Sequence, residues 1–330
     1  MSGSWIAKPL GSLGAEERAM YRALYRPDFP LSQSLEWGHA FSAPDRHPFV
    51  VFSPERKAAS LFAVSGDGTE AECVNGPVLD WERIRDPRGL NEQISMSVFA
   101  LHQAKPGLRS VRLRPRLGLP EFEFLREHLA FPLDRVDNAR TMVLDLADSV
   151  DGQWRSLPSR IRSEIKRSHR HGVRVELVSS VEVIDDFWAK TRAFYHSRGL
   201  PIPDRDWIHG LLSGRGERGI ESDVITAFHE KSGSEASLLL LRFGGVGIYF
   251  FAHESRGLEC PNLSLNVSAQ WEAMKACMGS GIRHYDLNGI LPPKHGEGGV
   301  DPYQGVDFYK RRFKGREVEY CNPLIRFEAT

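Results

Sequence analysis

The feature that most constrains the fold is a repeated alternation of strands and helices, which runs through the chain in two rounds of similar length. The first round is expected to contain helices at 16–25, 35–43, 90–103 and 120–128 and strands at 49–52, 59–64, 110–115 and 141–146. Segment 147–152 is polar and turn-rich, and it is predicted to separate the two rounds. This order favours an α/β fold of two domains, with mixed, mainly antiparallel sheets flanked by helices.

The second round opens with a helix whose pattern is clear. Ser156 is expected to cap it, an apolar face repeats every four residues through Ile161 and Ile165, and Gly172 supplies a left-handed end. The later elements are expected to be helices at 181–198 and 263–278 and strands at 173–177, 224–229, 235–243, 246–251 and 284–288. We therefore expect one domain at 1–148, joined by a returning strand within 317–330, and a second domain at 149–316.

Composition excludes several classes of protein. With 330 residues of which 41% are hydrophobic, the chain is long enough for two cores. Lys+Arg and Asp+Glu both number 43, so any binding of nucleic acid has to come from a local patch. The four cysteines are scattered and never fall at metal-ligand spacing, which favours neither zinc nor a disulfide framework. We expect no metal, no cofactor, no membrane insertion, a cytoplasmic location and a monomer.

An aromatic-lysine segment near the C-terminus is the first candidate site. A strand ending in Tyr285-Asp286-Leu287-Asn288-Gly289 is followed by a Pro/Gly-rich loop and then by Phe308-Tyr309-Lys310-Arg311-Arg312-Phe313-Lys314. The pKa of a lysine in such company is easily moved, and its ammonium can stabilise a developing oxyanion or bind a phosphate. Lys310 is therefore the candidate catalytic residue, and the alternative is a solvated lysine in a basic run.

A basic helix is the second candidate site. Arg162, Lys166 and Arg170 are spaced four apart and share a helix face, while Arg160 and Arg167 flank that face. Such a stripe suits phosphate groups, although most charge runs are solvated helix faces. Arg311, Arg312 and Lys314 would extend the positive region if the two segments meet in space.

Three segments, in this order, resemble the Fem family of aminoacyl-tRNA-dependent transferases, known for building peptidoglycan cross-bridges. They are the basic helix from Ser159 through Gly172-Val173, the unit from Asn262 through Gln270-Trp271-Glu272 to Tyr285–Gly289, and the closing segment Tyr309–Gly315. Weaker similarity includes Ser34–Trp37, Asn75–Val78 and Thr141–Leu146 followed by Trp154. The resemblance implies two tandem GNAT domains, the acyl-CoA N-acyltransferase-like fold.

The resemblance also implies an activity. An amino acid would pass from aminoacyl-tRNA to an amine of a peptide-like acceptor, either a peptidoglycan precursor or a peptide natural product. Lys310 matches the family's lysine beside the 3′ end of the tRNA, where its ammonium would stabilise the oxyanion or the leaving ribose oxygen. Phe308 and Tyr309 accompany it, and the basic residues would bind phosphates of the tRNA or of a nucleotide-linked acceptor.

The chain departs from the family pattern at two positions. Tyr309 stands where the family has Phe, which keeps an aromatic wall, and Lys314 stands where it has Gly, which puts a close backbone approach in doubt. The long charged helical hairpin of some members is missing, so the chain resembles the compact members that act on soluble acceptors.

Further assignments stay open on the sequence alone. Asp286 is either a general base for the acceptor amine or a structural group that caps the turn at Asn288. Tyr249 either lines the acceptor side or belongs to the core. A second interpretation is an acyl-CoA N-acyltransferase, although the nearest pyrophosphate-loop candidate, Arg215–Ile220, has its glycines at the wrong spacing. A third is a tRNA-binding protein without catalysis.

Overall fold

The structure, a computed structural model, describes residues 4–25, 33–40, 46–55, 57–74, 76, 87–114, 133–200, 202, 205–212, 220–257, 263–290 and 304–326. The chain divides into two compact units. The first contains Met1–Ala139, Asp206–Gly214 and Glu319–Thr330, and the second contains Arg140–Arg205 and Arg215–Val318. The predicted division after residue 148 falls a little further along the chain than this boundary, which lies inside a single strand, β6 (Leu133–Asp145).

The first unit is a mixed sheet with helices packed on it. Its strands are β1 (Ile6–Pro9), β2 (Arg46–Phe52), β3 (Ala59–Ser65), β4 (Glu70–Val74), β5 (Ser110–Arg114) and the end of β12 (Arg316–Arg326). Neighbours in this order pair antiparallel except β4 and β5, which are parallel. The chain thus returns to the first unit through β12, which pairs with β5 from Leu324 to Arg326.

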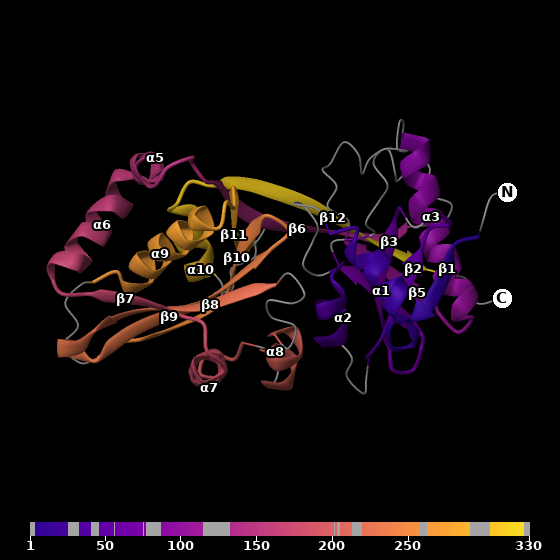
Figure 1. The fold of residues 1–330 in the computed structure, drawn as a ribbon, viewed down its shortest axis with the longest axis horizontal. Coiled ribbons are helices and arrows are strands. Elements are labelled where there is room, and N and C mark those ends of the chain that lie inside the picture. The colour runs from indigo at the N-terminus through magenta and orange to yellow at the C-terminus, as the bar shows by residue number, and fades with distance from the viewer. Residues whose placement is uncertain are drawn as a thin grey trace. The chain divides into compact units, whose positions relative to one another are not determined.

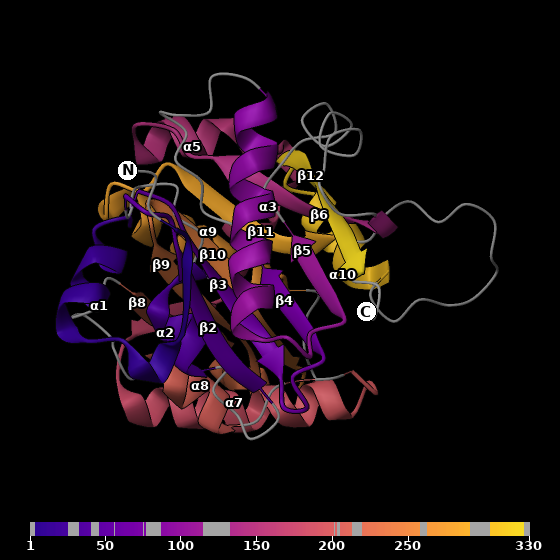
Figure 2. The same cartoon turned by 90° about the vertical axis from the view of Figure 1, so that its right-hand side faces the viewer.

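Helices cover this sheet because its strands are apolar on both faces. α3 (Pro87–Ala104) crosses one face (Figure 2), where Phe49, Phe62 and Val98 share a buried cluster. α1 (Ala15–Arg22) and α2 (Leu35–Ala40) also belong to this unit, and the buried Tyr21 ring of α1 packs edge-on against Phe52. The predicted helix at 120–128 lies outside the described residues.

The second unit holds both candidate sites. Its elements are α5 (Val150–Ser156), α6 (Ser159–Arg170), β7 (Arg174–Val178), α7 (Val181–His196), β8 (Glu221–His229), β9 (Ser234–Phe243), β10 (Val246–Ser255), α9 (Leu265–Gly279), β11 (His284–Ile290) and α10 (Gln304–Arg311). The strand order is β6-β11-β10-β9-β8-β7. The described pairs are antiparallel except β10 with β11, so the predicted mixed, mainly antiparallel α/β fold is confirmed. Helix α8 (Arg205–Leu212) is grouped with the first unit.

The alternation of side chains along β8 and β9 divides the second unit into layers. Ile225 and Leu238 belong to the cluster beneath α9, whereas Val224 and Ser237 point to the other face, towards α7. Figure 1 shows α9 and α7 on opposite faces of this sheet, with α6 packed outside α9. Helix α6 can form this outer layer because Ile161 and Ile165 are buried on the side that faces α9.

The expected start of the second round was wrong in detail. Segment 147–152 is not a linker, because α5 begins within it and Ser149 caps that helix by accepting a hydrogen bond from the Gly152 amide. Ser156 caps nothing, since its hydroxyl donates to the Gln153 carbonyl at the end of α5. Pro158 then precedes α6. Gly172 does adopt the predicted left-handed conformation, with φ of 85°.

No helix among the described residues is long and apolar enough to cross a lipid bilayer.

Candidate functional site

Strands β10 and β11 pair only at their first residues and then part. Their parallel ladder runs from Val246 opposite His284 to Ile248 opposite Asp286 and goes no further. Beyond that point β10 has a bulge at Tyr249–Phe251 against β9, and β11 has an irregularity between Asp286 and Gly289 against β6. The carboxyl ends of diverging parallel strands are a common place for ligands in α/β folds.

Lys310 of α10 reaches the place where these strands part. Only 6% of the residue is exposed, its Nζ donates to the Gly289 carbonyl at 2.6 Å, and Nζ lies 5.8 Å from the centre of the Tyr249 ring. Burial lowers the pKa of Lys310 to about 8, against an opposing effect of the carboxylates of Asp286 and Asp307. The described part of the chain offers no acceptor for the other N–H donors of this ammonium.

Asp286 lies beside the point where β10 and β11 separate, and it accepts hydrogen bonds that fix the local backbone. It is buried, and its Oδ1 accepts hydrogen bonds from the Thr141 hydroxyl and, at 2.7 Å, from the Asn288 amide. Asn288 has a positive φ of 66°, a conformation that asparagine tolerates, and its side chain accepts from the Gly289 amide at 2.8 Å. Asp286 therefore holds the turn that presents the Gly289 carbonyl to Lys310.

Tyrosines form an enclosed wall beside Lys310. The Tyr309 ring packs edge-on against Phe313 with centroids 5.5 Å apart, and its hydroxyl is buried without a hydrogen-bond partner among the described residues. Tyr285 donates to Gln270 at 2.5 Å. Burial raises the pKa of the Tyr249, Tyr285 and Tyr309 hydroxyls, so all three stay neutral. An apolar wall of this kind weakens solvation around the Lys310 ammonium and strengthens its field.

The basic helix and the lysine segment do meet, through an acid. Arg312 Nη2 lies 2.5 Å from Glu164 Oε2, and Glu164 also accepts from Arg160 and, at 2.9 Å, from the Ser264 hydroxyl. Burial alone would raise the pKa of Glu164, but the hydrogen bonds from Arg312 and Ser264 outweigh it and lower the pKa. The two segments thus meet through Glu164, whereas Arg311 pairs with Asp307 and Glu317.

The residues that were predicted to flank the basic face of α6 lie towards Arg312. At 100° per residue, Arg160, Glu164 and Arg167 lie on the flank that faces Arg312, whereas Lys166 lies on the other. Lys166 and Arg170 are exposed and line a pocket beside Trp154. Arg162 and Arg167 are half-buried, each with an enclosed Nε. The exposed part of the predicted basic face therefore consists of Lys166 and Arg170.

Two further predicted residues are placed at the surface. Phe308 of α10 is 67% exposed, which is unusual for an aromatic side chain. Lys314 is also exposed, and it has a positive φ of 55°. This conformation explains why glycine suits the position.

The close backbone approach lies one residue after Lys314. A Cβ on Gly315 would be 2.8 Å from the Val143 carbonyl oxygen and 2.8 Å from Met142 Cγ. The chain keeps glycine there, so the departure at Lys314 does not disturb the approach.

We expect Lys314→Gly to raise the free energy of unfolding by about 0.5–1 kcal/mol, because a left-handed residue with a Cβ is strained. Gly315→Ala, the matched change at the adjacent position, should lower it by about 1–3 kcal/mol because backbone has to move. Urea unfolding of both variants measures the two effects. Equal effects of the two substitutions would contradict this assignment of the close approach.

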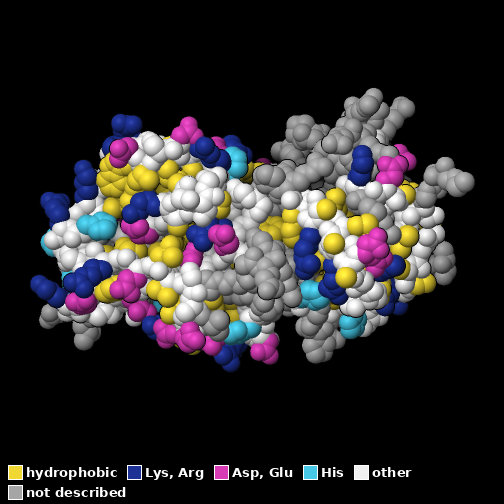
Figure 3. Space-filling view, in the orientation of Figure 1, with side chains coloured by type: hydrophobic (Ala, Val, Ile, Leu, Met, Phe, Trp, Pro, Cys, Tyr) yellow, Lys and Arg dark blue, Asp and Glu magenta, His cyan; other side chains and the backbone are white. Residues whose placement is uncertain are grey.

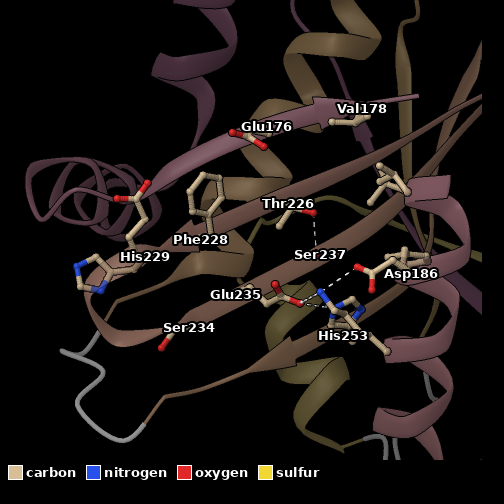
Figure 4. A pocket seen from close by; sticks show the side chains of 16 residues that line it. Glu176, Val178, Asp186, Thr226, Phe228, His229, Ser234, Glu235, Ser237 and His253 are labelled. Carbon is tan, nitrogen blue, oxygen red and sulfur yellow. Dashed lines mark hydrogen bonds and ion pairs between the residues drawn. The ribbon is translucent and has the colours of Figure 1, made fainter. Parts of the chain in front are cut away.

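The second unit also has a pocket of about 450 Å³ on the α7 side of its sheet (Figure 4). His253 is 5% exposed, and its ring nitrogens contact Thr191 Oγ1 at 3.0 Å and Glu235 Oε1 at 3.2 Å. Lys190 Nζ lies 2.9 Å from both Glu235 and Asp186. These charged groups satisfy one another across α7, β9 and β10, so the network serves to tie the helix to the sheet.

This network predicts acid sensitivity. Burial lowers the pKa of His253 below its ordinary value of 6.5, so the unfolded chain takes up the proton first as the pH falls. Stability from this group is therefore complete above pH 6.5 and declines below it. His253→Gln should flatten the loss of unfolding free energy between about pH 6.5 and 5, whereas His196→Gln, an exposed histidine of α7, should not. An unchanged slope for His253→Gln in urea unfolding would refute this.

Sequence reasoning missed several residues of the site. Thr141, Gly289 and Glu164 hold Asp286, Lys310 and Arg312 respectively. Glu164 had one signal in the sequence, as the acid between basic residues on an expected helix. The contact of Thr141 with Asp286 had none, because the two residues lie 145 apart in the chain.

Residues 155–311 match the family described as Acetyltransferase (GNAT) domain. No curated protein matches the chain in sequence.

Solved structures are similar over nearly the whole chain. FemX matches with a TM-score of 0.70 and 13% identity, covering 93% of this chain and 94% of FemX. L-PGS from Bacillus licheniformis matches with a TM-score of 0.57 and 11% identity, covering 96% and 93%. A tandem GNAT protein from the clavulanic acid biosynthesis pathway matches with a TM-score of 0.55 and 11% identity, covering 99% of each chain. The fold expected from the resemblance is thereby confirmed: the chain shares the fold of these solved structures, and residues 155–311 match the GNAT domain family.

Proposed function

We propose that the protein is an acyltransferase that moves an amino acid from aminoacyl-tRNA to an amine of a peptide-like acceptor. The observation that carries the proposal is the buried Lys310 ammonium at the parting of β10 and β11, with one donor bound to Gly289 and others unused by the described residues. The GNAT match and the FemX fold support acyl transfer, and the Fem-like segments supply the donor. Charged tRNA implies action in the cytoplasm, and we propose a monomer.

The reaction needs positioning and charge stabilisation more than covalent help. The acceptor amine attacks the ester carbonyl carbon, a tetrahedral oxyanion forms, and the C–O bond to the ribose breaks to leave a peptide bond and a ribose hydroxyl. Lys310 would donate to the oxyanion or to the departing ribose oxygen in a site of weak solvation. The proton lost by the amine balances the one gained by the ribose oxygen. Since the pKa of Lys310 is about 8, this residue can also return a proton to that oxygen.

Other predicted residues would bind the donor or hold the site in shape. Phe308 offers an exposed ring for stacking against an unpaired base at the 3′ end of the tRNA. Tyr249 and Tyr309 close the apolar side of the site. Asp286 would act by holding the Asn288 turn, because both of its described hydrogen bonds are structural.

The acyl-CoA alternative finds less support. A pyrophosphate at the start of α9 would meet the Glu164 carboxylate, which hydrogen-bonds to Ser264 just before the helix. Leu265 in the first turn is fully buried. The loop candidate Arg215–Ile220 lies outside the described residues except for Ile220.

One experiment separates the interpretations. The purified protein is mixed with radiolabelled aminoacyl-tRNAs or acetyl-CoA and a panel of amine acceptors, and product is followed by chromatography. We expect labelled product from an aminoacyl-tRNA, and none when the donor is treated with ribonuclease before mixing. Product that survives this treatment, or product from acetyl-CoA alone, would overturn the proposal. Lys310→Met serves as the control for a contaminating transferase.

A further inference from the structure

A second pocket of the same unit, about 520 Å³ in volume, lies at the surface between α5, α6 and α9. It is lined by Trp154, Ile165, Lys166, His169, Arg170 and Trp271. Three of these side chains are apolar or aromatic, and three are basic. The volume is that of a site for a small organic ligand. None of these residues contributes to the hydrogen bonds around Lys310.

The apolar part of this pocket is built from two indoles. The Trp154 and Trp271 rings pack edge to face with centroids 5.2 Å apart and an interplanar angle of 63°. Trp271 is only 7% exposed, whereas Trp154 is half-buried and therefore presents ring surface to the pocket. Figure 3 shows apolar side chains gathered between α5 and α9, with Lys and Arg side chains at the edge of the patch. A flat aromatic surface of this kind suits stacking.

The basic part lies along one flank of α6. Lys166 Nζ is 5.8 Å from the centre of the Trp154 ring, and Lys166, His169 and Arg170 are all exposed. The only acid of the helix, Glu164, lies on the opposite flank, where Arg312 and Ser264 bind it. The pocket is therefore positive beside its aromatic surface, and nothing on that flank of α6 neutralises it.

We propose that this pocket binds a nucleotide, with the base stacked on Trp154 and a phosphate held by Lys166 and Arg170. A nucleotide is the ligand class that joins a flat ring to an anion at short range, and base-on-indole stacking is tolerant of sequence. The choice of source rests on the proposed function: the nucleotide belongs either to the single-stranded end of the tRNA or to a nucleotide-linked acceptor. Binding itself needs no catalysis.

The test measures binding by calorimetry with the full chain and three probes: uridine diphosphate, an RNA hairpin with a single-stranded 3′ end, and the same hairpin without that end. We expect Trp154→Leu to weaken the binding of whichever probe occupies the pocket by about 10-fold or more, and Trp154→Phe to weaken it less. Lys166→Gln should weaken it as well, and with RNA it should reduce the salt dependence by about one phosphate contact. Lys231→Gln, the same change at an exposed lysine outside the pocket, should have no effect.

The outcomes are distinct. An effect of Trp154→Leu confined to the RNA with a single-stranded end supports the tRNA as source, and an effect confined to uridine diphosphate supports a nucleotide-linked acceptor. Unchanged binding of all probes by folded Trp154→Leu and Trp154→Phe would overturn the proposal, as would an effect of Lys166→Gln without one of Trp154→Leu. If no donor supported transfer, the proposed function would be contradicted, but the result of the binding measurement would still hold.

Discussion

Lys310→Met should lower the rate of acyl transfer by a factor of about 10²–10³, the usual loss when one donor to a developing oxyanion is removed. Methionine fills similar space, so the strand ends and the tyrosine wall should stay in place. The measurement is kcat/KM for product formation with saturating acceptor, and the loss should fall mainly on kcat. Because the ammonium is the active form, the rate of the wild type should decline as the pH rises through about 8.

The same substitution should make the protein more stable at neutral pH. A folded pKa of about 8 against the ordinary 10.5 means that the unfolded chain binds more protons between these values. The wild type therefore gains stability as the pH rises from 8 to 10.5, and below pH 8 it carries the full cost of the buried charge. Removing that charge should raise the free energy of unfolding by up to about 3 kcal/mol. Loss of the hydrogen bond to Gly289 should lower it by about 1 kcal/mol.

Urea unfolding at pH 7 and at pH 10 measures this gain, which should be present at pH 7 and much smaller at pH 10. Lys231→Met is the matched control, since Lys231 is exposed, and it should change neither activity nor stability. A Lys310→Met variant that keeps full activity, or that loses stability at pH 7, would show that this lysine is a structural group. Gain of stability with loss of activity is the mark of a group kept for function.

Glu164→Ala should lower the free energy of unfolding by about 2–3 kcal/mol, the largest loss expected from a single side chain in this region. The carboxylate is 11% exposed and binds Arg312, Ser264 and Arg160, so its removal leaves Arg312 without its counter-ion and frees the start of α9 from α6. The effect stays below that of a fully buried pair because Arg312 is 22% exposed. Circular dichroism during urea unfolding gives the measurement.

A double-mutant cycle separates the contacts of Glu164. We expect a coupling of about 1–2 kcal/mol with Arg312→Ala and less than about 0.5 kcal/mol with Arg160→Ala, whose side chain is 80% exposed. The pKa of Glu164 is lowered, so its contribution should be complete above pH 4.5 and lost as the pH falls through the lower folded value. Equal couplings for the two arginines would show that α6 and α10 are not joined through this acid.

The sequence identified Lys310 as a candidate residue, but it did not predict the contacts that surround this lysine. Lys310 was identified because aromatic neighbours and a Fem-like segment are local in the chain. Its burial and its contact with Gly289 depend on how α10 packs against the end of β11, across a Pro/Gly-rich loop. The segment was expected simply to follow a loop, whereas residues 304–311 form a helix that aims the lysine inward.

The helix that was expected to begin at Ser156 shows why local patterns fail. A serine before an apolar repeat is a good cap signal, but Ser149 provides an earlier cap and Pro158 separates two helices. Strands β1 and β4 were not predicted, and both are positioned by their pairing, β1 with β2 and β4 with β3 and β5.

The sequence by itself determined which elements form and which residue types lie near one another along the chain, because hydrophobic period, turn residues and helix ends are local properties. It thus determined the α/β class, the presence of strands β2 and β3, and the aromatic neighbours of Lys310. Only the tertiary structure decided that Thr141 holds Asp286 and that Glu164 joins Arg312 to α6. Those contacts depend on which faces are buried together, and burial is a property of the packed chain.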